Sequence, residues 1–115
     1  MFLGKEVRVL LKGQGKEAYL ELKKRTDKEA IAIVSSFERV KEILKQNPQF
    51  GDPIRKELIP KKFMTMGVQN LYRVELSNYW RALYTLEGNV VQIFLFVLSI
   101  VDHKEYNKLF GYKKK

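Results

Sequence analysis

Cysteine is absent from the 115-residue chain, and histidine occurs once, at His103. Without cysteine the chain forms no disulfide and no thiolate metal site, and a single histidine excludes a histidine-rich metal site. We therefore expect no metal ion and no other cofactor. Any chemistry must use Arg, Lys, Glu, Asp, Tyr or the one histidine.

Long apolar runs are also missing. The longest run, near residues 93–101, is about half of the roughly 20 residues that a membrane-spanning helix needs. The N-terminal sequence MFLGKEVRV lacks the apolar core and the cleavage site of a signal peptide. The sequence therefore predicts an intracellular, cytoplasmic protein without a membrane partner.

Acidic residues are few compared with basic ones. The chain has 13 Asp and Glu against 22 Lys and Arg, a formal net charge of +9, which predicts a polyanionic partner such as RNA, DNA, anionic lipid or an acidic protein. Part of this excess lies in Lys113, Lys114 and Lys115, which we interpret as a solvated tail. A hydrophobic content of 45% over this length is enough for one core, so we expect a single domain spanning residues 1–115.

The chain begins with the pattern of a strand followed by a helix. Apolar residues at alternate positions of 7–11 predict a half-buried strand, which Gly13 and Gly15 would end. Apolar residues at helical spacing among lysines and glutamates then predict a short amphipathic helix over 16–25.

A second, longer helix follows. Thr26 and Glu29 fit the S/T-x-x-E capping box that begins a helix, and Pro48 would stop it. The apolar stripe between them consists of Ala30, Ile33, Val34, Phe37, Val40 and Leu44. We expect this stripe to pack on one face of a sheet and to leave the other face, or its rim, for function.

Residues 50–70 contain two prolines and two glycines and are interpreted as a loop or irregular connector. Connectors of this length in compact domains are often functional. The alternative is a loop that merely covers the core, held by Ile54, Leu58, Ile59 and Phe63. The sequence leaves both interpretations open.

The second half of the chain predicts three consecutive strands. Residues 71–76 and 79–84 have strand composition and are separated by Ser77 and Asn78. Residues 90–100 are apolar at almost every position, which favours an interior strand covered on both faces. The predicted fold is α+β in β-α-α-β-β-β order, with one twisted, largely antiparallel sheet packed against two N-terminal helices and a short C-terminal helix or tail.

The segments LYRVELSNYWRALYTL and VVQIFLFVLSIVDHKEY, with the IRKEL connector before them, resemble the RelE/ParE superfamily of type II toxin–antitoxin toxins. Those toxins show a K-L-x-G connector, then Y-R-(I/V)-R and (Y/W)-R-(I/L)-(I/V)-Y, then (V/I)-x-x-(I/V)-x-H-R-x-x-x-Y. The resemblance covers nearly the whole chain and is clearest over 54–112. It implies a RelE-like fold and an mRNA interferase that cuts mRNA on the ribosome by attack of a ribose 2′-hydroxyl on the adjacent phosphate.

By this resemblance Arg73 and Arg81 stand at the arginine positions of the first two meander strands, and His103 and Lys104 at the His-Arg positions after the third. The expected catalytic residues are Arg73, Arg81, His103, Lys104 and Tyr106. The arginines suit a phosphate because a guanidinium grips two of its oxygens. Histidine suits an acid or base role because its ordinary pKa of about 6.5 lies near working pH.

Other positions are expected to contribute less directly. Glu75 is a possible base. The chain differs from the family pattern at two positions: Glu75 stands where the family commonly repeats a basic residue, and Lys104 replaces Arg. Either Tyr106 or Tyr112 corresponds to the tyrosine that stacks on a base or activates the attacking hydroxyl. The residues expected to bind RNA are Lys56, Lys61, Lys62 and Tyr112.

Simpler interpretations stay open for the same residues. Arg73 and Glu75 share one face of a strand and can form a solvent-facing ion pair, worth about 0–1 kcal/mol. His103 can be a structural or exposed histidine. At the level of function, a ParE-like toxin that acts on DNA gyrase without nuclease activity, or a non-catalytic basic module that binds RNA or the ribosome, also fits. In either toxin interpretation the expected partner is a small cognate antitoxin protein.

Overall fold

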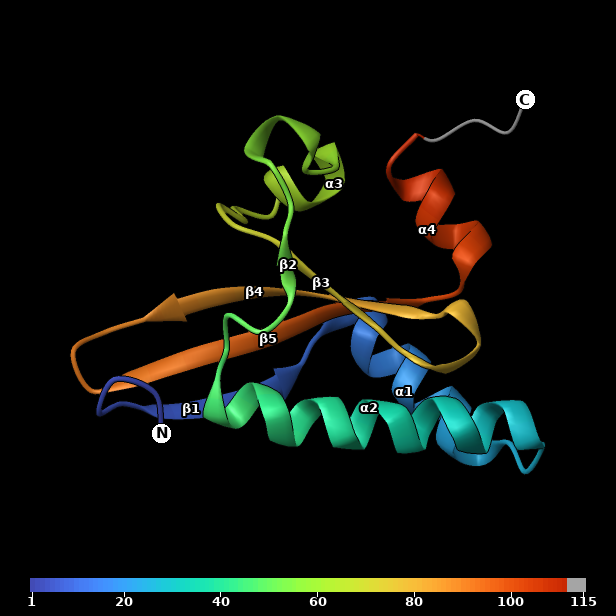
Figure 1. Cartoon of the computed structure of the whole chain (residues 1–115). Helices are drawn as coiled ribbons and strands as arrows, with labels where there is room; N and C mark the ends of the chain where they lie inside the picture. Colours follow the sequence, from blue (N-terminus) through green and yellow to red (C-terminus); the bar gives the residue numbers. More distant parts are fainter. Residues whose placement is uncertain (112–115) are drawn as a thin grey trace.

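The computed structural model describes residues 1–111 of the chain and shows an α+β architecture with one five-stranded sheet and four α-helices within that range (Figure 1). The strands are β1 (Glu6–Leu11), β2 (Asp52–Pro53), β3 (Tyr72–Glu75), β4 (Arg81–Gly88) and β5 (Gln92–Val101). The helices are α1 (Gly13–Lys24), α2 (Lys28–Gln46), α3 (Lys61–Met64) and α4 (His103–Leu109), with 3₁₀ turns at Lys56–Leu58 and Ser77–Tyr79.

The sheet is mixed, and its strand order is β1-β5-β4-β3-β2. β1 lies parallel to β5, and all other neighbours are antiparallel. β5 therefore lies inside the sheet, between β1 and β4, which confirms the prediction of an interior strand over residues 92–100. The predicted start is wrong, because Val90 and Val91 lie in the preceding turn and are 88% and 67% exposed. The α+β class and the two helices packed on one sheet are confirmed as well.

Helices α1 and α2 cover one face of the sheet (Figure 1). The buried residues of this first core are Val7, Leu22, Ala30, Ile33, Phe37, Leu44, Val74, Leu76, Ala82, Tyr84, Leu95, Val97 and Ile100. The predicted stripe of α2 supplies four of them, and Val34 and Val40 pack against their edge. The apolar spacing of this helix therefore identified its packing face correctly.

The opposite face of the sheet is covered by the 54–68 segment and by α4, which rise on the same side in Figure 1. The buried residues of this second core are Ile59, Phe63, Leu71, Leu83, Leu98, Val101 and Tyr106. The connector is thus not a bare loop: it contains β2, a 3₁₀ turn and α3. Ile59 and Phe63 hold it down as predicted, whereas Leu58 is 46% exposed and does not.

The start of α1 differs from the prediction. The helix begins at Gly13, where φ is +52°, and Gly15 lies inside the helix rather than at the end of a strand. A Cβ at Gly15 would lie 2.6 Å from the Val97 carbonyl oxygen. Gly15 is therefore the point at which α1 makes its closest approach to β5, a long-range contact that local sequence rules do not show.

The cap of α2 also differs from the prediction. Asp27, and not Thr26, is the N-cap, because the Asp27 carboxylate accepts a hydrogen bond from the Ala30 N–H at 3.1 Å. Arg25 grips both oxygens of the same carboxylate at 2.8 Å. The bidentate pair with Arg25 stabilises the Asp27 carboxylate in its capping position, and a capping box with Thr26 would lack this pair.

We expect this cap to make stability depend on pH. The hydrogen bonds from Arg25 and Ala30 lower the pKa of Asp27 from 3.8 to about 2. Because the folded value is the lower one, the stabilisation is present above pH 3.8 and is lost as the pH falls to about 2. In Asp27→Asn, which keeps an accepting oxygen but does not titrate, urea unfolding should show a smaller loss of stability over this interval. An equal loss in both proteins would contradict the assignment.

Within residues 1–111 no helix combines the length and the apolar character that crossing a membrane requires.

Candidate functional site

Strand register brings four charged side chains together at the β2–β3–β4 edge of the sheet. Asp52 of β2 pairs with Arg73 of β3, and Glu75 of β3 pairs with Arg81 of β4. Arg73 and Glu75 are two residues apart, so both side chains lie on the face opposite α1 and α2. With Tyr106 of α4, these residues form the arginine cluster.

Glu75 lies between the two arginines of the cluster. Its Oε2 is 3.1 Å from Arg81 Nε and 3.7 Å from Arg73 Nε. The longer distance exceeds that of a hydrogen bond, so this buried Arg73 N–H has no hydrogen-bond partner among the described residues. Arg73 Nη2 also donates to Asp52 Oδ2 at 3.3 Å. One carboxylate oxygen is thus shared by two guanidinium groups.

Tyr106 contacts both arginines of the cluster. The guanidinium carbon of Arg81 lies 4.6 Å from the centre of the Tyr106 ring and that of Arg73 lies 5.8 Å from it. Arg73 Nη1 donates to the Tyr106 hydroxyl at 3.0 Å, and this hydrogen bond raises the pKa of Arg73 above its ordinary value. The two cations are therefore held against one aromatic face.

The position of Tyr106 corrects one expectation. The side chain is only 3% exposed, and its ring packs against Phe110 at a centroid distance of 4.6 Å. A buried ring offers no free face to an RNA base, so Tyr106 acts here by positioning Arg73 and Arg81. Tyr112, the other candidate tyrosine, lies outside the described residues.

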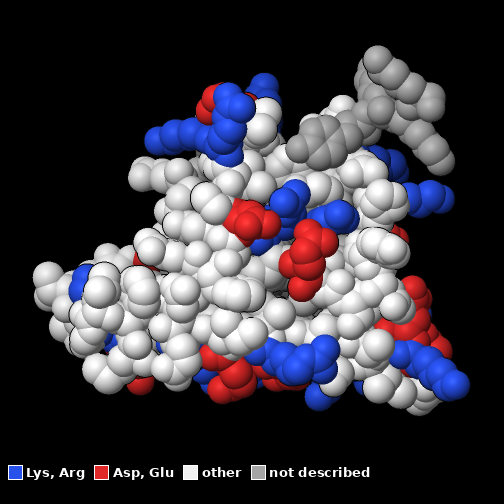
Figure 2. All heavy atoms as spheres, in the orientation of Figure 1, with Lys and Arg blue, Asp and Glu red and all other residues white. Residues whose placement is uncertain are grey.

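Burial differs sharply between the cations and the anions of the cluster. The side chain of Arg81 is 17% exposed and that of Arg73 is 31% exposed, whereas Glu75 and Asp52 are 56% and 70% exposed. Figure 2 shows basic and acidic side chains together over the middle of this face. Because exposed carboxylates lose little by turning into water, an incoming phosphate can replace them on arginines that are already in place.

The predicted residues divide into three groups in space. Arg73, Arg81, Glu75 and Tyr106 meet in the cluster. His103 and Lys104 begin α4 and line a neighbouring hollow with Tyr79 and Trp80. Lys56, Lys61 and Lys62 are exposed along the 54–68 segment, where Figure 2 shows further basic side chains apart from the central group.

One hydrogen bond links the arginine cluster to the hollow lined by His103 and Lys104. Arg81 Nη1 donates to the Tyr79 carbonyl oxygen at 3.4 Å, so the side chain that faces Glu75 also contacts the turn beside His103. The cluster and the neighbouring hollow are therefore adjacent regions of one surface.

Asp52 and Tyr79 are the residues that sequence reasoning missed. Asp52 belongs to a two-residue strand, for which no periodicity exists to be recognised. Tyr79 was assigned to the second meander strand, but it lies in the turn before it, with a left-handed φ of +62° directly after Asn78 at +59°. A two-residue type I′ turn usually has Asn at its first central position and Gly at the second. Here Tyr79 stands in place of the glycine, and its strand-like side chain led to the wrong assignment.

Two buried serines, Ser36 of α2 and Ser99 of β5, offer a matched test of hydrogen bonding. Ser36 Oγ donates to the Ile33 carbonyl at 2.8 Å and accepts from Ser77 N–H at 3.0 Å, whereas the Ser99 hydroxyl is buried without a partner among the described residues. Ser36→Ala should lower the free energy of unfolding by roughly 1–3 kcal/mol, and Ser99→Ala should leave it unchanged or raise it. Urea titration of both variants checks the difference. Equal losses would contradict this account of the two hydroxyls.

Within residues 1–111 no three His, Asp or Glu side chains converge as metal ligands. The chemistry of this region is that of two guanidinium groups, a shared carboxylate and a nearby imidazole. Comparisons of the chain with family models, with curated proteins and with solved structures found no match.

Proposed function

We propose that this protein is the toxin of a type II toxin–antitoxin system, an endoribonuclease of RelE-like fold that cleaves mRNA on the ribosome. The observation that carries the proposal is the pair of arginines on adjacent strands, held against Tyr106 with one exchangeable carboxylate between them. A net charge of +9 supports a polyanionic substrate.

The reaction is an internal transesterification. The ribose 2′-oxygen forms a bond to the adjacent phosphorus, and the bond from phosphorus to the 5′-oxygen of the next nucleotide breaks. The products are a 2′,3′-cyclic phosphate and a free 5′-hydroxyl. Negative charge builds on the phosphorane oxygens in the transition state, and cations fixed in advance at that place stabilise it more than they stabilise the substrate.

Arg81 and Arg73 supply those cations in the proposal. The scissile phosphate takes the place of the Glu75 carboxylate between the two guanidinium groups, where each arginine can donate to its oxygens. Their low exposure means that little side-chain freedom is lost on binding.

Glu75 and His103 complete the proton transfers. Once displaced, the Glu75 carboxylate stays beside the phosphate and accepts the proton of the 2′-hydroxyl. His103, at the adjacent hollow, donates a proton to the departing 5′-oxygen when it is in the imidazolium form. Lys104 and the exposed lysines 56, 61 and 62 attract the surrounding phosphates.

A cognate antitoxin is part of the same proposal. Such a partner would cover the arginine cluster with acidic side chains and so keep phosphate away from Arg81. Its gene is expected next to that of the toxin, and the two proteins should purify as a complex.

The decisive experiment is to express the chain under an inducible promoter and to map mRNA ends. We expect growth arrest, mRNA cuts that need translating ribosomes, and fragments that end in 2′,3′-cyclic phosphate. Intact mRNA with inhibited DNA supercoiling would replace the proposal by the gyrase-directed alternative. Binding of RNA without cleavage or arrest would leave a non-catalytic basic module.

A further inference from the structure

Tyr79 combines two properties that are unusual together. Its side chain is 76% exposed, and its backbone has a left-handed φ of +62°. Bulky residues rarely adopt this conformation, and the second position of a type I′ turn normally holds glycine. An exposed aromatic residue at a position that disfavours it points to a role outside the fold.

The turn that carries Tyr79 is firmly held, so the strain persists. Trp80 N–H donates to the Ser77 carbonyl at 3.2 Å, and Leu76 N–H donates to the Trp80 carbonyl at 2.8 Å. Ser77 N–H also donates to Ser36 of α2 at 3.0 Å. These bonds attach the turn to both the sheet and the first helical layer.

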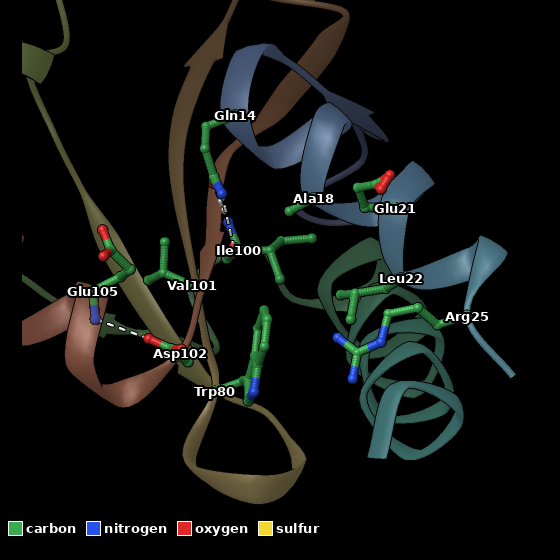
Figure 3. Close-up of a pocket in the computed structure, with 10 residues that line it drawn as sticks. All are labelled: Gln14, Ala18, Glu21, Leu22, Arg25, Trp80, Ile100, Val101, Asp102 and Glu105. Atoms are coloured by element: carbon green, nitrogen blue, oxygen red, sulfur yellow. Dashed lines mark hydrogen bonds between the residues drawn. The ribbon is translucent and has the colours of Figure 1, made fainter. Parts of the chain in front are cut away.

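Trp80 anchors the turn on its other side. Its indole ring forms part of the wall of a cavity of about 160 Å³, which Leu22 of α1 and Ile100 and Val101 at the end of β5 also line (Figure 3). With Trp80 directed inward, its neighbour Tyr79 remains at the surface. The turn therefore presents one aromatic ring to solvent on a rigid base.

The surroundings of Tyr79 carry charges of both signs. The hollow beside it, of about 520 Å³, is also lined by Asn78, His103 and Lys104, and by Arg25, Glu29 and Asp102 as well. Within residues 1–111 the side chains of Asn78, His103 and Lys104 make no hydrogen bond or ion pair. Arg25 of the same hollow is paired with Asp27 and Glu29, and Asp102 accepts a hydrogen bond from the Glu105 N–H as the cap of α4. An exposed ring beside an unpaired lysine, a histidine and an amide is a combination with which proteins hold unpaired bases and their phosphates.

We propose that Tyr79 is the stacking platform of a subsite for one base of single-stranded RNA, with Lys104 and His103 facing the adjoining phosphates and Asn78 facing the base edge. The subsite deepens the proposed function and rests on it, because the Arg81 contact with the Tyr79 carbonyl joins it to the arginine cluster. A strand whose scissile phosphate lies on Arg81 and Arg73 places a neighbouring nucleotide over Tyr79.

The test uses direct binding, so that it does not depend on cleavage. The probe is a short single-stranded oligoribonucleotide that contains 2-aminopurine as a fluorescent base. Each of its riboses carries a 2′-O-methyl group, so that no 2′-hydroxyl is present to attack the phosphate. Tyr79→Gly should weaken its binding by about 5- to 150-fold and abolish the quenching of 2-aminopurine fluorescence. Tyr79→Phe keeps the ring and should bind and quench like the unaltered protein.

Stability separates loss of stacking from loss of folding. Glycine suits the left-handed position, so Tyr79→Gly should not lower the midpoint of thermal unfolding. Leu3→Gly is the matched control, because Leu3 is also left-handed, with φ +53°, and is 84% exposed in the turn that precedes β1. Leu3→Gly should leave RNA binding unchanged.

Three outcomes would overturn the subsite: no quenching by the unaltered protein, unchanged binding in Tyr79→Gly, or an equal loss in Tyr79→Phe. Duplex RNA, whose bases are stacked internally, should show no Tyr79-dependent binding. Tyr79-dependent binding of the probe by a protein that never cuts mRNA would refute the nuclease proposal and leave the subsite standing.

Discussion

Arg81→Ala should reduce the rate of ribosome-dependent mRNA cleavage by about 10²- to 10³-fold, the usual effect of removing one donor to charge that develops in a transition state. The side chain is 17% exposed, shares Glu75 with Arg73 and lies 4.6 Å from the centre of the Tyr106 ring. Arg73 alone cannot hold two phosphate oxygens in the same arrangement. The measurement is single-turnover cleavage of a defined mRNA on purified ribosomes.

Controls for this prediction follow from the same contacts. Arg81→Met keeps an unbranched stem over the Tyr106 ring, so a loss of cleavage with unchanged thermal unfolding assigns the effect to the guanidinium. Arg81→Lys keeps the charge but not the planar fork and should recover only part of the rate. Arg39→Ala removes one positive charge from the exposed surface of α2 and should change little, because within residues 1–111 the one hydrogen bond of the Arg39 side chain is to Ser35. Full activity in Arg81→Ala would refute the phosphate-binding role.

Tyr84→Phe should lower the free energy of unfolding by roughly 1–3 kcal/mol although it removes a single oxygen atom. The side chain is fully buried, and its hydroxyl donates to the Pro48 carbonyl at 2.7 Å and accepts from Gly51 N–H at 3.0 Å. Burial raises the pKa of Tyr84 to about 12, so the hydroxyl is protonated at neutral pH. Phenylalanine leaves both backbone groups buried without a partner.

Tyr72→Phe provides the matched control for Tyr84→Phe. The Tyr72 ring stacks on that of Tyr84 at a centroid distance of 5.1 Å, but its hydroxyl makes no hydrogen bond within residues 1–111. Its removal should therefore change stability little. Urea unfolding at neutral pH distinguishes the two variants, and equal stability losses would contradict the role of the Tyr84 hydroxyl.

Tyr84 also connects the fold to the site. A Cβ at Gly51 would lie 2.8 Å from the Tyr84 hydroxyl and 2.9 Å from the Arg73 carbonyl oxygen, so the chain before β2 is packed tightly against β3 and β4. Asp52 follows directly and pairs with Arg73. The predicted loss of stability in Tyr84→Phe should therefore be accompanied by a looser β2–β3 pair.

Much of the fold was predictable because its signals are local. Hydrophobic spacing located α2 and its packing face, and apolar character at almost every position placed β5 inside the sheet. The prediction failed where an element is too short to have a period, as in β2 and α3, or where two local signals compete, as Thr26 and Asp27 do for the cap of α2. Whether a short segment forms a strand or helix depends on residues far away in the sequence, and the choice between two caps depends on a small difference in free energy.

The order of the main elements follows from the sequence, as do the excess of positive charge and the residue types available for chemistry, because composition and periodicity are properties of neighbouring residues. Which charged side chains meet depends on the tertiary fold. The pairing of Glu75 with Arg81, the burial of Tyr106 beneath both arginines and the exposure of Tyr79 beside His103 all follow from strand register and from the docking of α4. These are contacts between distant segments, and a local pattern carries no information about their register.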